Sequence, residues 1–363
     1  MRKISKQEGD NLMSRLARKS KTSKATVIIS VILFALFFVC AAFLISQIQL
    51  ALASPVPEEI ITFEGSDERI VVLDPGHGYG NTNVFQGYDE QVRMLALAHK
   101  IRPLLEAEGI TVLMTRDTEE NVLLPVRAAK INLWALEFIQ EMKRGELEFA
   151  EEEYEAQILQ YQIHELDRLI GILHKIIDDP ETYAGVYFNF PFDNTHSRQI
   201  HPELQRIFEF QDNQRLREQF LMISLHSNAP PNPIDTSING ADAFFVSNNL
   251  RIRSYFANYT SVNQSAYFAE RIIENIDTIG IRRGRAFGTN FLILRETNVP
   301  AVLVENGYHT NPEDREKLLC DIFLADLAVV YRDTILAYFD NISEAPEHRP
   351  TIPRILGNLF DMF

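Results

Sequence analysis

Two histidines and two glutamates stand where this 363-residue chain could bring metal-binding and acid–base groups together. His77, His226 and Glu305 each end or follow a short apolar run, and Glu90 opens an amphipathic one. Two imidazoles and one carboxylate form a set that binds catalytic Zn²⁺, with the fourth position left to water. A further carboxylate near that water could act as general base and later as acid. The residue types alone leave open which glutamate would bind the metal.

The surroundings of the two histidines favour a site, although a turn with an incidental histidine has the same local pattern. His77 lies between Gly76 and Gly78 after the strand-stopping Pro75, and glycines let another group approach the backbone closely. His226 precedes Ser227 and Asn228. Open α/β sheets bind ligands beyond the carboxyl ends of their strands, so these ends are where a site is expected.

The elements that must position these groups alternate along the chain. Apolar runs without polar alternation predict buried strands, and apolar residues at helical spacing predict helices. We expect strands over 70–73, 111–115, 220–226, 240–247, 290–294 and 300–305, and helices over 90–106, from about 125 to 140, and over 264–276, 311–319 and 321–339. This order predicts an α/β fold, with a single twisted mixed sheet flanked by helices on both faces.

Charge is distributed unevenly between the N-terminal segments and the remainder. Residues 1–25 carry eight Lys or Arg and two acids, residues 26–53 carry no charge, and the remainder carries 27 basic and 48 acidic side chains. The uncharged run is long enough to cross a bilayer, and its basic flank predicts an N-terminus inside and a body outside. We therefore expect a transmembrane anchor at 26–53, with cleavage after Ala53 as the alternative. The acidic body argues against nucleic-acid binding.

A long segment interrupts the α/β alternation. Residues 133–219 read as a helical insertion, rich in glutamate between 146 and 155, with an apolar stripe at Leu159, Ile163, Leu166, Ile170 and Leu173. A stripe at this spacing predicts one amphipathic helix. The insertion could be a solvated hairpin, an extension of a substrate groove or a regulatory element.

Five segments together resemble the amidase type 3 (AmiA/B/C-like) family of zinc-dependent N-acetylmuramoyl-L-alanine amidases. They are "VVLDPGHGYG", "DEQVRMLALAHKI", "VLMTRDTEENVLLPVRAAKIN", "FLMISLHSNA" and "VPAVLVENGYHTNPEDREKL". The resemblance covers about residues 70–132 and 220–340, in the order of the family.

The resemblance implies zinc ligands at His77, Glu90 and His226 and a catalytic carboxylate at Glu305. Asp89 is the alternative to Glu90, but the apolar positions of the helix fit the family's register only with Glu90. Asn228 would line the substrate cleft. The implied reaction is hydrolysis of the amide between N-acetylmuramic acid and L-alanine in peptidoglycan. Arg116 and Arg127 are read as structural, with Arg127 pairing with a carboxylate.

The expected organisation follows from these segments: a cytoplasmic basic segment (1–25), an anchor (26–53), a linker (54–68), a catalytic domain (69–132 and 220–341), the insertion (133–219) and a tail (342–363). The body would face the cell wall, where it would act in remodelling or daughter-cell separation. A carboxylate of the insertion could block the zinc position until a protein activator docks on the insertion. The rival interpretations are a non-catalytic cell-wall or division protein on the same fold and another zinc peptidase acting on stem peptides.

Overall fold

The computed structural model describes residues 68–80, 83–190, 198–232, 234–247 and 250–342. The expected anchor at 26–53, the linker before residue 68 and the tail after residue 342 lie outside these ranges. Within the described residues, no helix is both long and apolar enough to cross a membrane. All described residues belong to one compact unit.

A six-stranded mixed sheet forms the centre of this unit, in the order β4-β1-β5-β8-β6-β7. Strands β1, β4, β5 and β8 run parallel, while β6 is antiparallel to β8 and parallel to β7. The strands are β1 (Ile70–Pro75), β4 (Thr111–Met114), β5 (Phe220–Asn228), β6 (Ala241–Val246), β7 (Arg283–Thr289) and β8 (Ala301–Tyr308). A separate hairpin joins β2 (Val84–Phe85) to β3 (Tyr88–Asp89).

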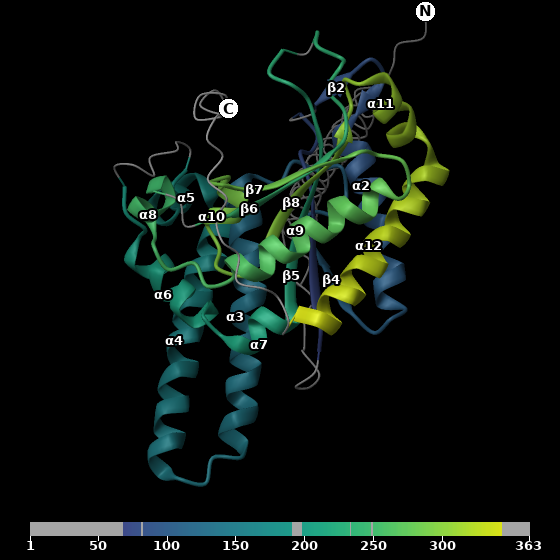
Figure 1. The fold of residues 1–363 in the computed structure, drawn as a ribbon. Coiled ribbons are helices and arrows are strands. Elements are labelled where there is room, and N and C mark those ends of the chain that lie inside the picture. Colours follow the sequence, from purple (N-terminus) through teal and green to yellow (C-terminus); the bar gives the residue numbers. More distant parts are fainter. Residues whose placement is uncertain (1–67, 81–82, 191–197, 233, 248–249, 343–363) are drawn as a thin grey trace, which may run out of the picture. The chain divides into compact units, whose positions relative to one another are not determined.

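Helices cover both faces of the sheet (Figure 1). One face packs on α2 (Glu90–Glu106), α9 (Val262–Asp277) and α12 (Asp321–Asn341), whose apolar side chains join those of β1, β5, β6 and β8 in one buried core. The other face lies under α3 (Leu124–Glu148) and short helices, which are α6 (Pro202–Gln211), α7 (Gln214–Gln219), α8 (Leu250–Tyr255) and α10 (Leu292–Arg295). Helix α11 (Pro312–Leu319) precedes α12. The predicted mixed sheet between two helical layers is confirmed.

The insertion is built around a hairpin of two long helices that projects from the body (Figure 1). Helix α3 continues past the sheet, and α4 (Glu153–Asp178) returns along it to α5 (Pro180–Tyr187). Leu159, Leu166 and Leu173 of the predicted stripe are buried, so the stripe joins α4 to α3.

One local prediction is wrong. Residues 290–294 were expected as a strand, but α10 occupies 292–295, and the strand of this region is β7 at 283–289. Strand β7 is an edge strand with two arginines and two glycines, so it lacks the apolar pattern by which strands are detected. Residues 180–219 hold α5 and α7 in addition to α6. Cys320 is exposed at the junction of α11 and α12.

Candidate metal centre and acid–base site

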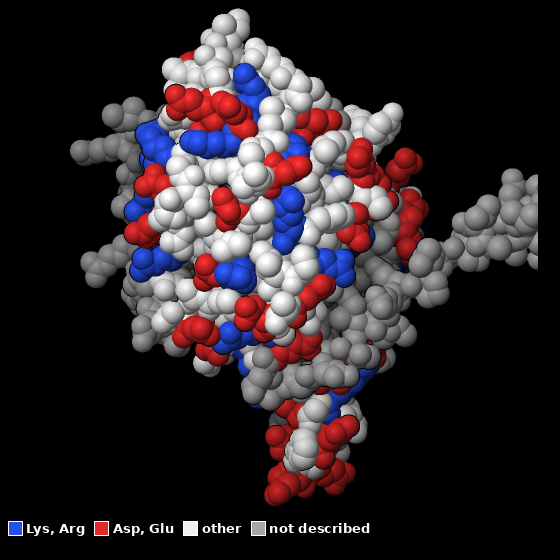
Figure 2. Space-filling model, turned by 90° about the vertical axis from the view of Figure 1, so that its right-hand side faces the viewer, with Lys and Arg blue, Asp and Glu red and all other residues white. Residues whose placement is uncertain are grey.

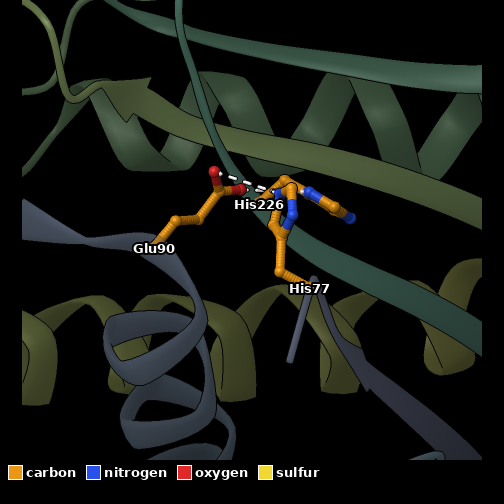
Figure 3. A group of neighbouring side chains, drawn as sticks. All are labelled: His77, Glu90 and His226. Carbon is orange, nitrogen blue, oxygen red and sulfur yellow. Dashed lines mark hydrogen bonds and ion pairs between the residues drawn. The ribbon is translucent and has the colours of Figure 1, made fainter. Parts of the chain in front are cut away.

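Three strands and one helix bring His77, Glu90, His226 and Glu305 to one edge of the sheet. His77 follows β1, His226 lies near the end of β5, and Glu90 is the first residue of α2. One ligand atom each from His77, Glu90 and His226 lies within 4.8 Å of the others. Figure 3 shows the Glu90 carboxylate directed at the two imidazoles. Asp89 does not belong to this cluster.

The Glu90 carboxylate holds the cluster together. Its Oε2 lies 3.2 Å from Nε2 of His77, and its Oε1 lies 3.1 Å from Nδ1 of His226. The Ser227 N–H donates to Oε1 at 2.9 Å and the Asn83 amide donates to Oε2 at 2.9 Å. Burial would raise the pKa of Glu90, but hydrogen bonds and charge from His226 and His77 outweigh burial and lower it. The residue is therefore an anion at neutral pH, which is the form that binds a cation.

Two buried arginines fix the loop that carries His77. Arg116 donates to the carbonyl oxygens of Pro75 and Gly76, at 2.8 and 2.7 Å. Arg127 donates to the carbonyls of Pro75 and His77 and pairs with Asp74 at 2.8 Å. His77 has a φ of +61°, a conformation that costs energy outside glycine and needs such support. The prediction that Arg127 pairs with a carboxylate is confirmed, and that carboxylate is Asp74.

Gly76 explains why the second imidazole can sit so close to this loop. A Cβ on Gly76 would lie 2.4 Å from Cε1 and 2.6 Å from both nitrogens of His226. The His226 ring therefore occupies the space that a side chain at residue 76 would fill, and Gly76 sets how closely the two histidines approach each other.

Glu305 lies beside the cluster because of strand register. It pairs with His226 of β5 on one side and with Asp242 of β6 on the other. Its Oε2 atom is buried, and no group of the described residues hydrogen-bonds to it. Burial and then the charges of Glu90 and Asp242 raise the pKa of Glu305 well above its usual range. A carboxylate with a raised pKa next to side chains that could bind a metal ion is suited to proton transfer.

Asp242 is a further acid beside Glu305 that the sequence motifs did not mark, and Asn228 lies at the end of the neighbouring strand β5. Asp242 accepts from the Tyr308 hydroxyl at 3.0 Å and from the Arg285 N–H at 2.9 Å. A lone acid inside the apolar run 241–246 was the signal available in the sequence. Asn228 is half-buried at the end of β5, and its carbonyl accepts from the His309 N–H at 3.0 Å.

His309 packs against Tyr88 and Ser227, next to the cluster. It is buried, stacks on Tyr88 with ring centroids 5.2 Å apart, and lies 3.1 Å from the Ser227 hydroxyl. The Tyr88 hydroxyl donates to the same Ser227 hydroxyl at 2.8 Å. Because the Ser227 N–H binds Glu90, this packing orients the residue that holds the ligand carboxylate.

Comparison with known proteins supplies the family. The chain matches the Amidase_3 family, described as N-acetylmuramoyl-L-alanine amidase, over residues 71–139 and 193–337, which together are more than half of the chain. The chain belongs to this amidase family. Amidase_3 membership confirms the resemblance seen in the sequence motifs. The unmatched residues 140–192 contain the outer part of α3 with α4 and α5, so the hairpin lies largely outside the family match.

The similarity to individual proteins is weaker than the match to the family. The chain is 39% identical over 67 residues to the "Probable cell wall amidase LytH" of Staphylococcus saprophyticus, a match that covers 17% of this chain and 23% of that protein. The N-acetylmuramoyl-L-alanine amidase of Clostridium difficile 630 is 17% identical with a TM-score of 0.44, over 76% of this chain and 98% of that one. Ami1 of Mycobacterium smegmatis is 16% identical with a TM-score of 0.44, over 75% and 97%. The family match, and not these structures, decides the assignment.

Proposed function

We propose that this chain is a zinc-dependent amidase that hydrolyses the bond between the lactyl carbonyl of N-acetylmuramic acid and L-alanine in peptidoglycan. The observation that carries the proposal is the cluster of His77, Glu90 and His226 with Glu305 beside it in register. Family membership supplies the reaction class, because the same ligand set also occurs in other zinc hydrolases.

The residues present fit a zinc ion. Two imidazole nitrogens and one ionised carboxylate are the donors that catalytic zinc uses, and a three-ligand set leaves a position open. The ligands also have the supporting hydrogen bonds that metal sites require, from Ser227 and Asn83 to Glu90. When bound, zinc supplies a Lewis acid that polarises a carbonyl and acidifies water.

The side chains of the protein then perform the proton transfers and the positioning. Glu305 takes a proton from the attacking water and delivers it to the leaving amine of L-alanine. Its Oε2, buried and without a hydrogen-bond partner among the described residues, is the atom that would accept this proton. Arg116 and Arg127 hold His77 in its left-handed conformation, and Asn228 contributes an amide near the substrate.

We also propose that the body acts outside the cytoplasmic membrane, in cell-wall remodelling or daughter-cell separation. The support is the uncharged segment 26–53 with its basic N-terminal flank, which predicts an anchored N-terminus inside and a catalytic body outside. Labelling with a membrane-impermeant thiol reagent tests this in full chains whose native Cys40 and Cys320 are replaced by serine and which carry one new cysteine, either at residue 10 or at Ile322. Labelling of Ile322→Cys alone supports the topology, whereas labelling of both or neither in intact cells contradicts it.

The distance between the glutamate-rich end of the insertion and the site favours docking of a partner over blocking of the metal. Arg127 near the N-terminus of α3 contacts the loop of His77, and α3 continues to Glu148. At about 1.5 Å per residue, Glu148 lies about 30 Å from that contact. The glutamates at 146–155 therefore lie far from the zinc position in this conformation, which argues against them as the blocking carboxylate.

The outer half of the hairpin has an uncovered aromatic face. Tyr154, Ile158 and Tyr161 lie on one side of α4 at helical spacing, with exposed fractions of 74%, 40% and 64%. Nearer the body, Arg168 of α4 pairs with Glu203 of α6 at 2.6 Å, so α6 adjoins the inner half only. Six glutamates and no Lys or Arg lie at 145–164, and Figure 2 shows acidic side chains gathered on the projecting part.

We infer that this face docks a protein with basic and apolar side chains. Peptidoglycan stems and anionic lipids would be repelled by the glutamates, whereas a basic partner would be attracted. Binding of a synthetic Lys/Leu amphipathic helix to the full chain tests the inference. Tyr154→Ser with Tyr161→Ser should weaken binding at least ten-fold, while Ile322→Ser, at another exposed apolar position, should not. Equal binding by all chains, or loss of sacculus binding instead, contradicts it.

A further inference from the structure

Four neighbouring strands place a row of polar side chains across the site face of the sheet. His226 of β5 pairs with Glu305 of β8, which pairs with Asp242 of β6. The next strand, β7, is joined to this row where the Arg285 N–H donates to Asp242 Oδ1 at 2.9 Å. Paired residues on adjacent strands direct their side chains to the same face, so His226, Glu305 and Asp242 are neighbours there.

The contact of Arg285 with Phe287 places Arg285 on that same face. Val304 of β8 and Ala243 of β6 pack into the core under α2, α9 and α12, and successive residues of a strand point to opposite faces, so Glu305 and Asp242 point away from that core. Because the pairing of β6 with β7 is irregular between Ala241 and Ala243, alternation does not decide the side of Arg285. The ring of Phe287, two residues after Arg285, contacts Phe244 with centroids 4.4 Å apart, which confirms the side.

The Arg285 guanidinium is the cation of this row, and it is not neutralised by a neighbour. Its Cζ lies 5.6 Å from the centroid of Phe287, a cation–π contact that orients the group. Within the described residues it forms no ion pair, whereas Arg283 of the same strand pairs with Glu270 at 2.9 Å. Among the described residues, no ion pair joins the Asp242 carboxylate to the Arg285 guanidinium, and the Asp242 oxygens accept from the Arg285 backbone N–H and from the Tyr308 hydroxyl.

The position of Arg285 relative to Glu305 matches the length of a short peptide. Two strand spacings separate them, which is about 10 Å. An extended peptide advances about 3.3–3.6 Å per residue, so a chain that leaves the scissile amide along the row reaches Arg285 at its second or third residue. In an acidic body, an exposed arginine at this point attracts an anionic group that the rest of the surface repels.

We propose that Arg285, oriented by Phe287, is a subsite for a free carboxylate on the second or third residue of the peptide attached to the muramoyl group. This inference rests on the proposed function and adds to it a preference between peptide stems. Stems whose carboxylate is free would bind better than stems in which it is amidated, because the arginine guanidinium donates charge-assisted hydrogen bonds to a carboxylate and only weaker ones to the neutral oxygen of an amide.

The test measures binding separately from hydrolysis. The probes are N-acetylmuramoyl-L-alanyl-D-glutamate and N-acetylmuramoyl-L-alanyl-D-isoglutamine, in which the α-carboxylate of the glutamate is amidated. Their affinities are measured by titration calorimetry with three zinc-loaded full-length chains, all carrying Glu305→Gln so that the probes stay intact. The first has no other change, the second adds Arg285→Gln, and the third adds Arg283→Gln, which removes the same charge from the same strand.

We expect the first chain to bind the free carboxylate about ten-fold more tightly than the amide, which is about 1.4 kcal/mol. Arg285→Gln should abolish this preference, and Arg283→Gln should leave it. Absence of a preference in the first chain, its persistence in Arg285→Gln, or its equal loss in Arg283→Gln overturns the proposal. Hydrolysis by chains that retain Glu305 is measured in parallel, so a failure of the amidase assignment is seen independently of the subsite.

Discussion

Replacing Gly76 by alanine tests the geometry of the metal centre most sharply. The new Cβ would lie 2.4 Å from Cε1 of His226, whereas ordinary van der Waals contact begins at 3.4 Å. The imidazole must therefore retreat by about 1 Å, while metal–ligand distances tolerate about 0.2 Å. The backbone itself accepts alanine, because Gly76 is not among the residues with positive φ.

We expect Gly76→Ala to lower zinc affinity about 100-fold, the upper end of what disturbing the support of a ligand costs. Overpacking should lower the unfolding free energy of the metal-free chain by no more than about 1–3 kcal/mol, because a side chain rather than the backbone can move aside. Competition with a chromophoric chelator measures the first quantity, and urea unfolding measures the second.

Gly171→Ala is the matched control for this change. A Cβ at Gly171 in α4 would meet no atom within 4 Å, so zinc affinity should stay unchanged and stability should rise by up to about 1 kcal/mol. Wild-type zinc affinity in Gly76→Ala would refute the inference that Gly76 sets the position of His226.

Three other changes test separate parts of the account. Glu305→Gln should retain zinc but reduce hydrolysis by about 10²–10⁴-fold, because a proton acceptor is lost while the ligands remain; loss of zinc together with activity would instead make Glu305 a ligand. Asp74→Asn should cost about 3 kcal/mol of unfolding free energy at pH 7, because it leaves Arg127 buried without its partner. Burial alone would raise the pKa of Asp74, but Arg127, Ser224 and Thr115 outweigh burial and lower it below 3.8 in the folded state. The contribution of Asp74 to folding stability is therefore complete above pH 3.8 and declines as the pH falls through the lowered pKa of the folded state. The stability of Asp74→Asn should depend less on pH in that range, and an equal acid dependence in both chains would contradict this. Leu166→Ala should lower stability by about 2–5 kcal/mol, because this fully buried side chain joins α4 to α3, with little change in zinc affinity; a large loss of zinc would show that the hairpin supports the metal centre.

The sequence predicted the central elements well because their signals are local. Ile70–Leu73 has no polar alternation, and a strand buried on both faces is what such a run forms. Glu90–Glu106 repeats apolar side chains at helical spacing, and α2 has the predicted limits. The glycines and Pro75 around His77 marked an unusual backbone, which the φ of +61° at His77 shows.

The other features of the fold and the site depend on pairing between distant segments, which the spacing of residues within one segment does not encode. Strand β7 is held by hydrogen bonds to β6 although its own residues are arginine- and glycine-rich, so its strand character comes from the sheet. The juxtaposition of Glu305 with Asp242 is a consequence of antiparallel register between β8 and β6. The direction of the hairpin, and hence the distance of its glutamates from the zinc position, follows from how α3 packs on the body.

The most direct test of the central claim is the bond that is cleaved. Purified peptidoglycan is digested with the zinc-loaded full-length chain, and new amino termini, new reducing ends and free lactyl carboxylates are measured together. The account predicts new L-alanine amino termini in equal number to lactyl carboxylates, without new reducing ends, and none of these products with a zinc-loaded Glu305→Gln chain. Cleavage within the stem peptide or the glycan, or undiminished cleavage by Glu305→Gln, would contradict it.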